Sequence, residues 1–127
     1  MKPLRSLVLA IVLLTEGVSV VAAQDYDKGL EAAQSGDFEA ALQEWRPLAE
    51  QGNSDAQKDL GVMYFTGQGV TQDYDEAVRW YRLAAEQGNV AAQSNLAEIY
   101  YKGQGVPQDF DEAAKWLQLV AKDGSAP

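Results

Sequence analysis

Apolar residues in the middle of the chain recur every four positions, which is the spacing of one face of an α-helix. The same three residue types return in the same order 36 positions later: Ala56, Leu60 and Tyr64, then Ala92, Leu96 and Tyr100. A second stripe of small and large apolar residues follows each of these: Ala77, Trp80, Tyr81 and Ala84, then Ala113, Trp116, Leu117 and Val120. The pattern predicts two pairs of amphipathic helices.

Over the whole chain, the same reasoning predicts six helices separated by turns. The expected boundaries are about 25–34, 38–51, 54–66, 74–87, 90–102 and 110–122. Pro47 interrupts the second helical pattern and is expected to kink it, because proline has no N–H group to donate. The first of these helices is short and is expected to cap the N-terminal end of the array. The predicted fold is all-α.

An eleven-residue phrase occurs twice, as GQGVTQDYDEA at residues 67–77 and as GQGVPQDFDEA at residues 103–113. Shifting the chain by 36 positions aligns it with itself from Gly52 to the end, and residues 36–53 match residues 72–89 as a third, partial copy. A repeat of this length is typical of stacked helical hairpins, each of which buries an apolar face against the next.

The phrase has the composition of a turn followed by a helix start. Glycine adopts positive φ without strain, so Gly67 and Gly103 are expected to end one helix and let the chain turn. Asp73 and Asp109 are expected to be the N-cap residues of the next helix. A glutamate three residues after each aspartate predicts a capping box that contributes about 1 kcal/mol.

With this repeat, the chain resembles the Sel-one-like repeat (SLR) family, which is related to the tetratricopeptide repeats but has a longer loop between its two helices. The resemblance rests on AQKDLGVMYFTGQGVTQDYDEAVRWYRLAAEQGN and AQSNLAEIYYKGQGVPQDFDEAAKWLQLVAKDG. It implies a short right-handed α/α solenoid of about three helix pairs, whose first helices line a concave face that binds a protein or peptide. The expected domain is 24–127, with a partial repeat at 25–52 and repeats at 53–88 and 89–124.

The first residues have the layout of a secretory signal peptide. MKPLR carries two positive charges, LVLAIVLL is apolar, and small residues precede a cleavage point after Ala23. The alternative, an uncleaved membrane anchor, would place Glu16 within the span at a cost of about 2.5 to 3.5 kcal/mol. Residues 1–23 are therefore expected to be removed, leaving an exported protein without a membrane anchor. The expected location is a bacterial periplasm or the outside of the cell.

Composition excludes several function classes. The chain has no cysteine and no histidine, so it lacks disulfides, thiolate nucleophiles, and the commonest general base and metal ligand. The formal net charge is −9, and removing the leader with Lys2, Arg5 and Glu16 leaves eight basic and eighteen acidic residues. A surface this acidic repels phosphate, which argues against nucleic acid as a partner. No cofactor or metal is expected.

The predicted binding residues lie on the first helix of each full repeat, opposite its core stripe. Counting 100° per residue from Leu60 and Tyr64 gives one set of candidates and its copy: Lys58, Val62 and Phe65, then Ser94, Glu98 and Tyr101. These pairs differ between the repeats, whereas the core pairs do not. Phe65 and Tyr101 are expected to be exposed aromatics, which are typical of contact surfaces.

The C-terminal end is the second candidate surface. The last predicted helix is followed only by KDGSAP, although terminal repeats normally need a polar cap. Apolar residues on this helix spread over more than one face: Trp116, Leu117, Leu119 and Val120. We expect either self-association into a homo-oligomer or docking of a partner helix at this edge.

The function that these patterns favour is an exported adaptor or scaffold, and not an enzyme. The alternative is an extracytoplasmic enzyme or binder acting on cell-wall or β-lactam-like ligands, because some secreted SLR relatives are linked to such ligands. Those relatives carry disulfides that this chain lacks, and no lysine follows a serine by three positions. Calcium binding by the acidic phrases is also conceivable, but helix capping explains the same carboxylates: Asp73, Asp75 and Glu76, and Asp109, Asp111 and Glu112.

Overall fold

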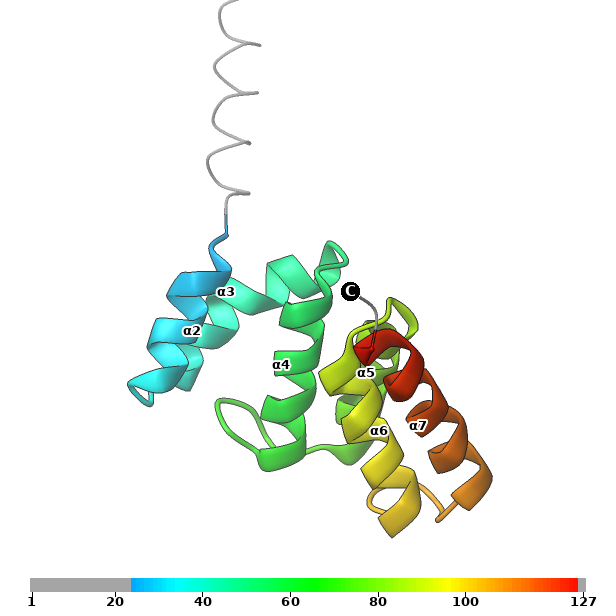
Figure 1. Ribbon diagram of the computed structural model, residues 1–127. Helices are drawn as coiled ribbons and strands as arrows, with labels where there is room; N and C mark the ends of the chain where they lie inside the picture. The colour runs from blue at the N-terminus through cyan, green and yellow to red at the C-terminus, as the bar shows by residue number, and fades with distance from the viewer. Residues whose placement is uncertain (1–23, 126–127) are drawn as a thin grey trace, which may run out of the picture.

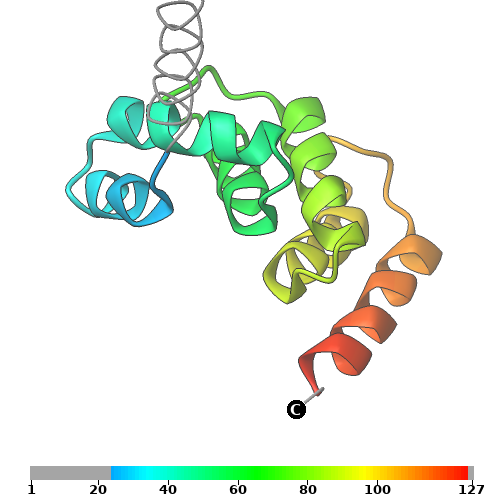
Figure 2. The same cartoon turned by 90° about the horizontal axis from the view of Figure 1, so that it is seen from above.

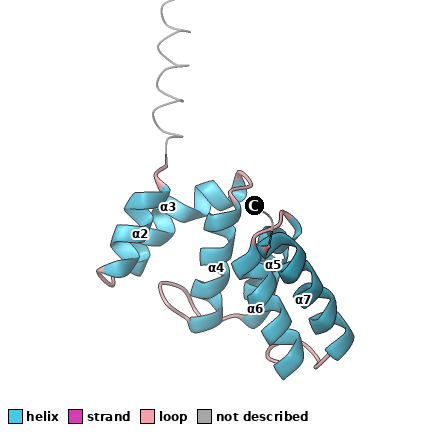
Figure 3. Cartoon of the chain, in the orientation of Figure 1, coloured by secondary structure: helices cyan, strands magenta, loops and turns pink. Residues whose placement is uncertain are grey.

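The computed structural model describes residues 24–125, and every regular element in that part of the chain is an α-helix (Figure 3). The six helices are α2 (Tyr26–Gln34), α3 (Phe38–Glu50), α4 (Ser54–Thr66), α5 (Tyr74–Glu86), α6 (Val90–Lys102) and α7 (Phe110–Gly124). Their ends lie within two residues of the predicted ones, and the all-α prediction is confirmed. The expected leader, residues 1–23, lies outside the described residues.

The helices form three consecutive hairpins, α2 with α3, α4 with α5, and α6 with α7, which follow one another across the molecule (Figure 1). Each helix packs mainly against the helices that precede and follow it in the chain. Seen from above, α2, α4 and α6 line the inner side of an arc, while α3, α5 and α7 form its outer side (Figure 2). This arrangement is typical of a solenoid, in which each unit contacts only its neighbours.

Most of the predicted turn chemistry is confirmed. Gly67 and Gly103 end α4 and α6 with φ of 74° and 70°, in the left-handed region. The carboxylates of Asp73 and Asp109 accept hydrogen bonds from the backbone N–H groups three residues later, at 3.1 and 3.0 Å. These aspartates are the N-caps of α5 and α7, as predicted.

The reciprocal half of the predicted capping box is wrong. The N–H of Asp73 donates to the carbonyl oxygen of Tyr64 at 2.9 Å, so it does not need the side chain of Glu76. That carboxylate instead accepts hydrogen bonds from Arg79, at 3.1 and 2.9 Å. The long loop brings the start of α5 back against the end of α4, and this backbone contact replaces the box.

Pro47 lies inside α3, which continues to Glu50. The proline has no N–H for the carbonyl of Gln43, but its own carbonyl still accepts the N–H of Gln51 at 3.1 Å. Only the last turn of the helix follows Pro47, so the lost bond does not end α3. The kink stays a prediction.

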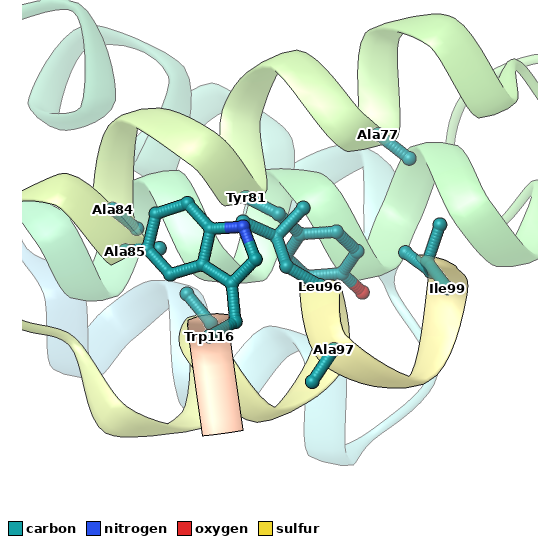
Figure 4. Close-up of a cluster of buried hydrophobic side chains, with 9 residues drawn as sticks. Ala77, Tyr81, Ala84, Ala85, Leu96, Ala97, Ile99 and Trp116 are labelled. Carbon is teal, nitrogen blue, oxygen red and sulfur yellow. The ribbon is translucent and has the colours of Figure 1, made fainter. Parts of the chain in front are cut away.

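Two apolar clusters hold the hairpins together. The first joins α3, α4 and α5: Ala41, Trp45, Ala49, Ala56, Leu60, Met63 and Trp80. The second joins α5, α6 and α7: Ala77, Tyr81, Ala84, Ala85, Ala92, Leu96, Ala97, Ile99 and Trp116 (Figure 4). All of these residues follow the predicted cleavage point, so a chain that begins at Gln24 contains both clusters.

Two helical glycines provide seats for aromatic rings of the following helix. A Cβ atom at Gly61 of α4 would lie 2.6 Å from the ring of Tyr81, and one at Gly29 of α2 would overlap the indole of Trp45. Tyr81 and Trp45 are 36 positions apart, whereas the two glycines are 32 apart, because the turn between α2 and α3 is four residues shorter. Gly29 in α2 is therefore the structural equivalent of Gly61 in α4, and the other residues of α2 can be aligned with those of α4 from this pair.

Candidate partner-binding groove

A groove of about 320 Å³ lies between α4 and α6, two of the helices that line the inner side of the arc (Figure 2). Its lining residues come from three helices and one loop: Val62, Phe65, Tyr81, Asn95, Glu98, Ile99, Lys102 and Gln104. We refer to it as the α4–α6 groove. The stacking of two successive hairpins creates it, since no single hairpin contributes both walls.

The floor of the α4–α6 groove is apolar and its rim is polar. Tyr81 and Ile99 are 4% and 3% exposed and belong to the second core cluster, so the floor is rigid. On the rim, the Lys102 ammonium contacts the Glu98 carboxylate at 2.5 Å. Both side chains are more than half exposed, and an ion pair of this kind contributes about 0 to 1 kcal/mol. The two charges can therefore re-pair with a ligand at little cost.

Tyr81 places a polar atom at this apolar floor. Its ring passes between α4 and α6, and the hydroxyl is directed toward Ile99 (Figure 4). Burial raises the pKa of Tyr81 well above its usual value, with smaller contributions from the negative charges of Asp59 and Glu98. The hydroxyl is therefore neutral at physiological pH and can donate or accept a hydrogen bond.

The structure brings three of the six predicted binding residues together in this groove: Val62, Phe65 and Glu98. The other three lie outside its lining. The ammonium of Lys58 contacts the Asp59 carboxylate at 2.7 Å, Ser94 is exposed elsewhere on α6, and the Tyr101 ring lies 5.3 Å from that of Phe110.

Phe65 is half-buried, and the expectation that it is an exposed aromatic is wrong. Its ring centroid lies 5.0 Å from that of Tyr74, and it also packs against the second core cluster. Sequence reasoning missed five lining residues: Tyr81, Asn95, Ile99, Lys102 and Gln104. Lys102 could have been predicted from the sequence, because it lies one helical turn after Glu98 on the same face. Tyr81 could not, because the apolar pattern of its own helix places it on the core side.

A second groove, of about 490 Å³, lies between the C-terminal ends of α5 and α7. Arg82, Lys115, Leu119 and Asp123 contribute to its walls, and Leu119 is one of the predicted C-terminal edge residues. Its basic and acidic side chains are mixed, so the groove has no dominant charge. Nothing about its lining points to a particular ligand.

The four predicted edge residues differ in exposure. Leu117 is 55% exposed, whereas Leu119 and Val120 are half-buried. Trp116 is 3% exposed and packs in the second core cluster (Figure 4), so its assignment to an open edge is wrong. Its indole packs against α5 and α6. One repeat earlier, the indole of Trp80 packs against α3 and α4 in the same way.

The repeated carboxylates do not converge on a common point. Asp73 and Asp109 cap helices, and the Arg79 hydrogen bonds hold the pKa of Glu76 below its usual value. Within residues 24–125, no three acidic, histidine or cysteine side chains come together as metal ligands would. None of the helices of that region has the length and apolar character needed to cross a bilayer.

Comparison with known proteins identifies the repeat. The Sel1 repeat model matches residues 54–89 and 90–125, so each match begins one residue after the repeat boundary expected from the sequence. Among curated proteins, no match was found.

Two solved structures resemble the chain closely. One is c5321, a protective antigen present in uropathogenic Escherichia coli strains that displays an SLR fold, with 36% identity and a TM-score of 0.73. The other is a Sel1 repeat protein from Oxalobacter formigenes, with 35% identity and a TM-score of 0.73. The matches cover 79% and 77% of this chain but only 22% and 40% of those proteins. This chain therefore spans less than half the length of either protein.

Proposed function

Since the chain belongs to the Sel1 repeat family, whose members are generally protein-interaction scaffolds, we propose that it binds an extended segment of a protein partner in the α4–α6 groove. The observation that carries this proposal is the apolar floor between two polar walls, built where two hairpins meet. Membership of the family supports a role in protein binding, and the α4–α6 groove is the proposed binding site.

The dimensions and chemistry of the groove suit a peptide. A volume of about 320 Å³ lies at the lower end of the range for small-ligand sites, and it accommodates one or two side chains but no folded domain. An apolar side chain of the partner would rest on Tyr81 and Ile99. The amides of Asn95 and Gln104 could then pair with the partner's backbone, since each amide offers both a donor and an acceptor.

Net charge favours a basic partner. The chain carries a formal net charge of −9, and one of −10 without the leader. A field of this sign attracts positively charged segments and increases their rate of encounter. Glu98 on the rim would receive a lysine or arginine of the partner after exchanging its contact with Lys102.

We also propose that the protein acts outside the cytoplasm, in a bacterial periplasm or after secretion. The support is the leader-like layout of residues 1–23, with positive charges, an apolar segment and small residues in order. N-terminal sequencing of the protein recovered from the producing cell tests this. A mature chain starting at Gln24 is expected, and an intact Met1 would contradict it.

The binding proposal is tested by crosslinked capture from the extracytoplasmic fraction with the wild-type chain and with a Val62→Lys, Glu98→Lys variant. Both substitutions lie in the groove on helices α4 and α6, and they should abolish capture of the specific partner. The matched control is Leu83→Lys, which adds a charge at a leucine of α5 that is 38% exposed and outside the groove. If the groove variant and the wild type capture the same proteins, the groove is not the binding site.

A further inference from the structure

The most exposed large apolar side chains of the described region are gathered in the last hairpin. They are Tyr101, Phe110 and Leu117, with exposures of 59%, 58% and 55%. The residues at the same positions one repeat earlier are covered to a greater extent, since Phe65 is half-buried, Tyr74 is 38% exposed and Tyr81 is 4% exposed. The aromatic pairs of the two hairpins pack alike, with ring centroids 5.0 Å apart for Phe65 and Tyr74 and 5.3 Å apart for Tyr101 and Phe110, so the greater exposure of the second pair reflects the absence of a covering neighbour in the described structure.

The next hairpin covers these positions in the middle of the molecule. Helix α6 buries Tyr81, which packs with Leu96 and Ile99. The loop before α7 covers Tyr74, because a Cβ atom at Gly105 would overlap the Tyr74 side chain. No described helix follows α7, which forms one end of the array in both views (Figures 1 and 2).

Within residues 24–125, one side of α7 therefore has no helix packed against it. Its residues are spaced four and three apart and are all exposed: Phe110, Ala114, Leu117, Ala121 and Gly124. The first four correspond to α5 residues that α6 and the loop after it cover, Tyr74, Val78, Tyr81 and Ala85, and Gly124 corresponds to Gly88 in the turn after α5. We refer to the five residues of α7 as the α7 stripe. None of them is charged, in a chain where 23% of residues are.

The other end of the array cannot receive the α7 stripe. In α4 and α6, Leu60 and Leu96 are fully buried and pack against the preceding hairpin. The register set by Gly29 and Gly61 places Lys28 at this position in α2, where it is exposed. A lysine at the centre of a stacking contact would lose its hydration without compensation. Head-to-tail stacking of copies is therefore disfavoured.

The α7 stripe is complementary to itself. When two α7 helices pack antiparallel about a two-fold axis at Leu117, Phe110 of one copy lies level with the Ala121–Gly124 end of the other, and Ala114 lies opposite Ala121. Bulky residues thus meet small ones, which permits close helix approach. We propose that the α7 stripe is an isologous dimer interface between two copies of this chain, independent of any partner in the α4–α6 groove.

The charged residues beside the stripe fit the same arrangement. Asp111 and Lys122 are both exposed and lie on the same flank of α7, eleven residues apart. The two-fold axis keeps this flank on one side of the dimer and reverses the helix direction. Asp111 of one copy therefore lies opposite Lys122 of the other, twice per dimer. A parallel arrangement would place this flank of the two copies on opposite sides of the interface, so Asp111 and Lys122 would not meet.

The first test measures the mass in solution of the chain from Gln24, by sedimentation at concentrations up to about 300 µM. We expect a dimer for the wild type. Leu117→Glu should raise the dissociation constant by about tenfold or more, since it buries two charges at the axis. Leu83→Glu, the same change at an exposed leucine of α5, should leave it unchanged. A monomeric wild type, larger open assemblies, or equal effects of the two variants would overturn the proposal.

The second test uses charge exchange to determine the direction of the helices. Asp111→Lys and Lys122→Glu should each weaken the homodimer, because each places like charges opposite one another. A mixture of the two variants should form a heterodimer in preference to either homodimer, since both contacts are then attractive. The wild-type affinity should return in the double variant. A mixture without this preference would overturn the antiparallel arrangement.

Discussion

At the scale of single residues, the absence of a side chain at Gly61 decides how α4 and α5 approach. Glycine inside a helix costs about 1 kcal/mol relative to alanine. In return, the Tyr81 ring lies directly on the α4 backbone and reaches the floor of the α4–α6 groove. In the last hairpin the corresponding residues are Ala97 and Leu117. The larger alanine in place of the glycine is thus accompanied by a leucine in place of the larger tyrosine.

Gly61→Ala is expected to lower the free energy of unfolding, although alanine is the better helix former. The new methyl group would lie 2.6 Å from the Tyr81 ring and would force the ring or the helix to move. Overpacking of this kind costs about 1 to 3 kcal/mol. Urea denaturation of the two proteins measures the difference.

The Tyr81→Leu background is the control for this prediction, since it reproduces the pairing of the last hairpin. In that background, Gly61→Ala should cost less than in the wild type or become stabilising. Equal costs in both backgrounds would mean that the ring contact is not the cause.

At the scale of elements, each helix begins after a short polar side chain, of which Asp73 and Asp109 were predicted as N-caps. Asp25, Asp37, Asn53, Asp73, Asn89 and Asp109 all accept hydrogen bonds from the first turn of the following helix. Such caps satisfy N–H groups that have no partner within the helix. The hairpin boundaries are therefore local features, which is why they could be read from the chain.

Asp73→Ala is expected to destabilise the protein by about 1 kcal/mol, because the N–H of Glu76 loses its acceptor. Glu76→Gln should change stability by less than about 0.5 kcal/mol, because its carboxylate makes only an exposed contact with Arg79. Thermal unfolding followed by circular dichroism compares the two. Equal losses would indicate that the two residues do act as a reciprocal capping box.

At the scale of the whole molecule, contacts within each hairpin and contacts between neighbouring hairpins both contribute to stability. The two clusters share α5, which supplies Trp80 to the first and Tyr81 to the second. Stability in such an array is approximately a sum of units and the interfaces between them. One end can therefore open while the other stays folded.

Trp45→Ala is expected to release the first hairpin selectively. The indole is 4% exposed, lies on Gly29, and donates a hydrogen bond to the carbonyl of Tyr26 at 3.1 Å. Its loss should cost about 3 to 5 kcal/mol. Hydrogen exchange should lose protection in α2 and α3 while α6 and α7 remain protected. A uniform loss in all six helices would instead show a single cooperative unit.

The two ends of the array also differ at this scale. An exposed lysine occupies the stacking position of α2, whereas α7 presents an uncharged stripe centred on Leu117. The α2 end carries a charged side chain that favours solvent exposure, whereas the α7 end presents apolar side chains that favour contact with another apolar surface. In the proposed dimer, this asymmetry would restrict association to the α7 end.

The sequence by itself determined the six helices, their caps and turns, and their arrangement in repeats. These depend on residues that are near in the chain, such as Asp73 and Glu76, or on periodic patterns that repetition makes visible. It also located Val62 and Glu98 on the groove side of their helices, since a helical face follows from a rotation of 100° per residue.

Only the tertiary structure decided which of these residues meet. Phe65 and Tyr101 have equivalent positions in the sequence, but one lies under the next hairpin and the other beside an open end. Tyr81 reaches the groove because Gly61 lets its ring pass, and Trp116 is removed from the edge because α5 and α6 enclose it. Burial depends on which neighbour covers a side chain, and a single helical pattern carries no information about its neighbours.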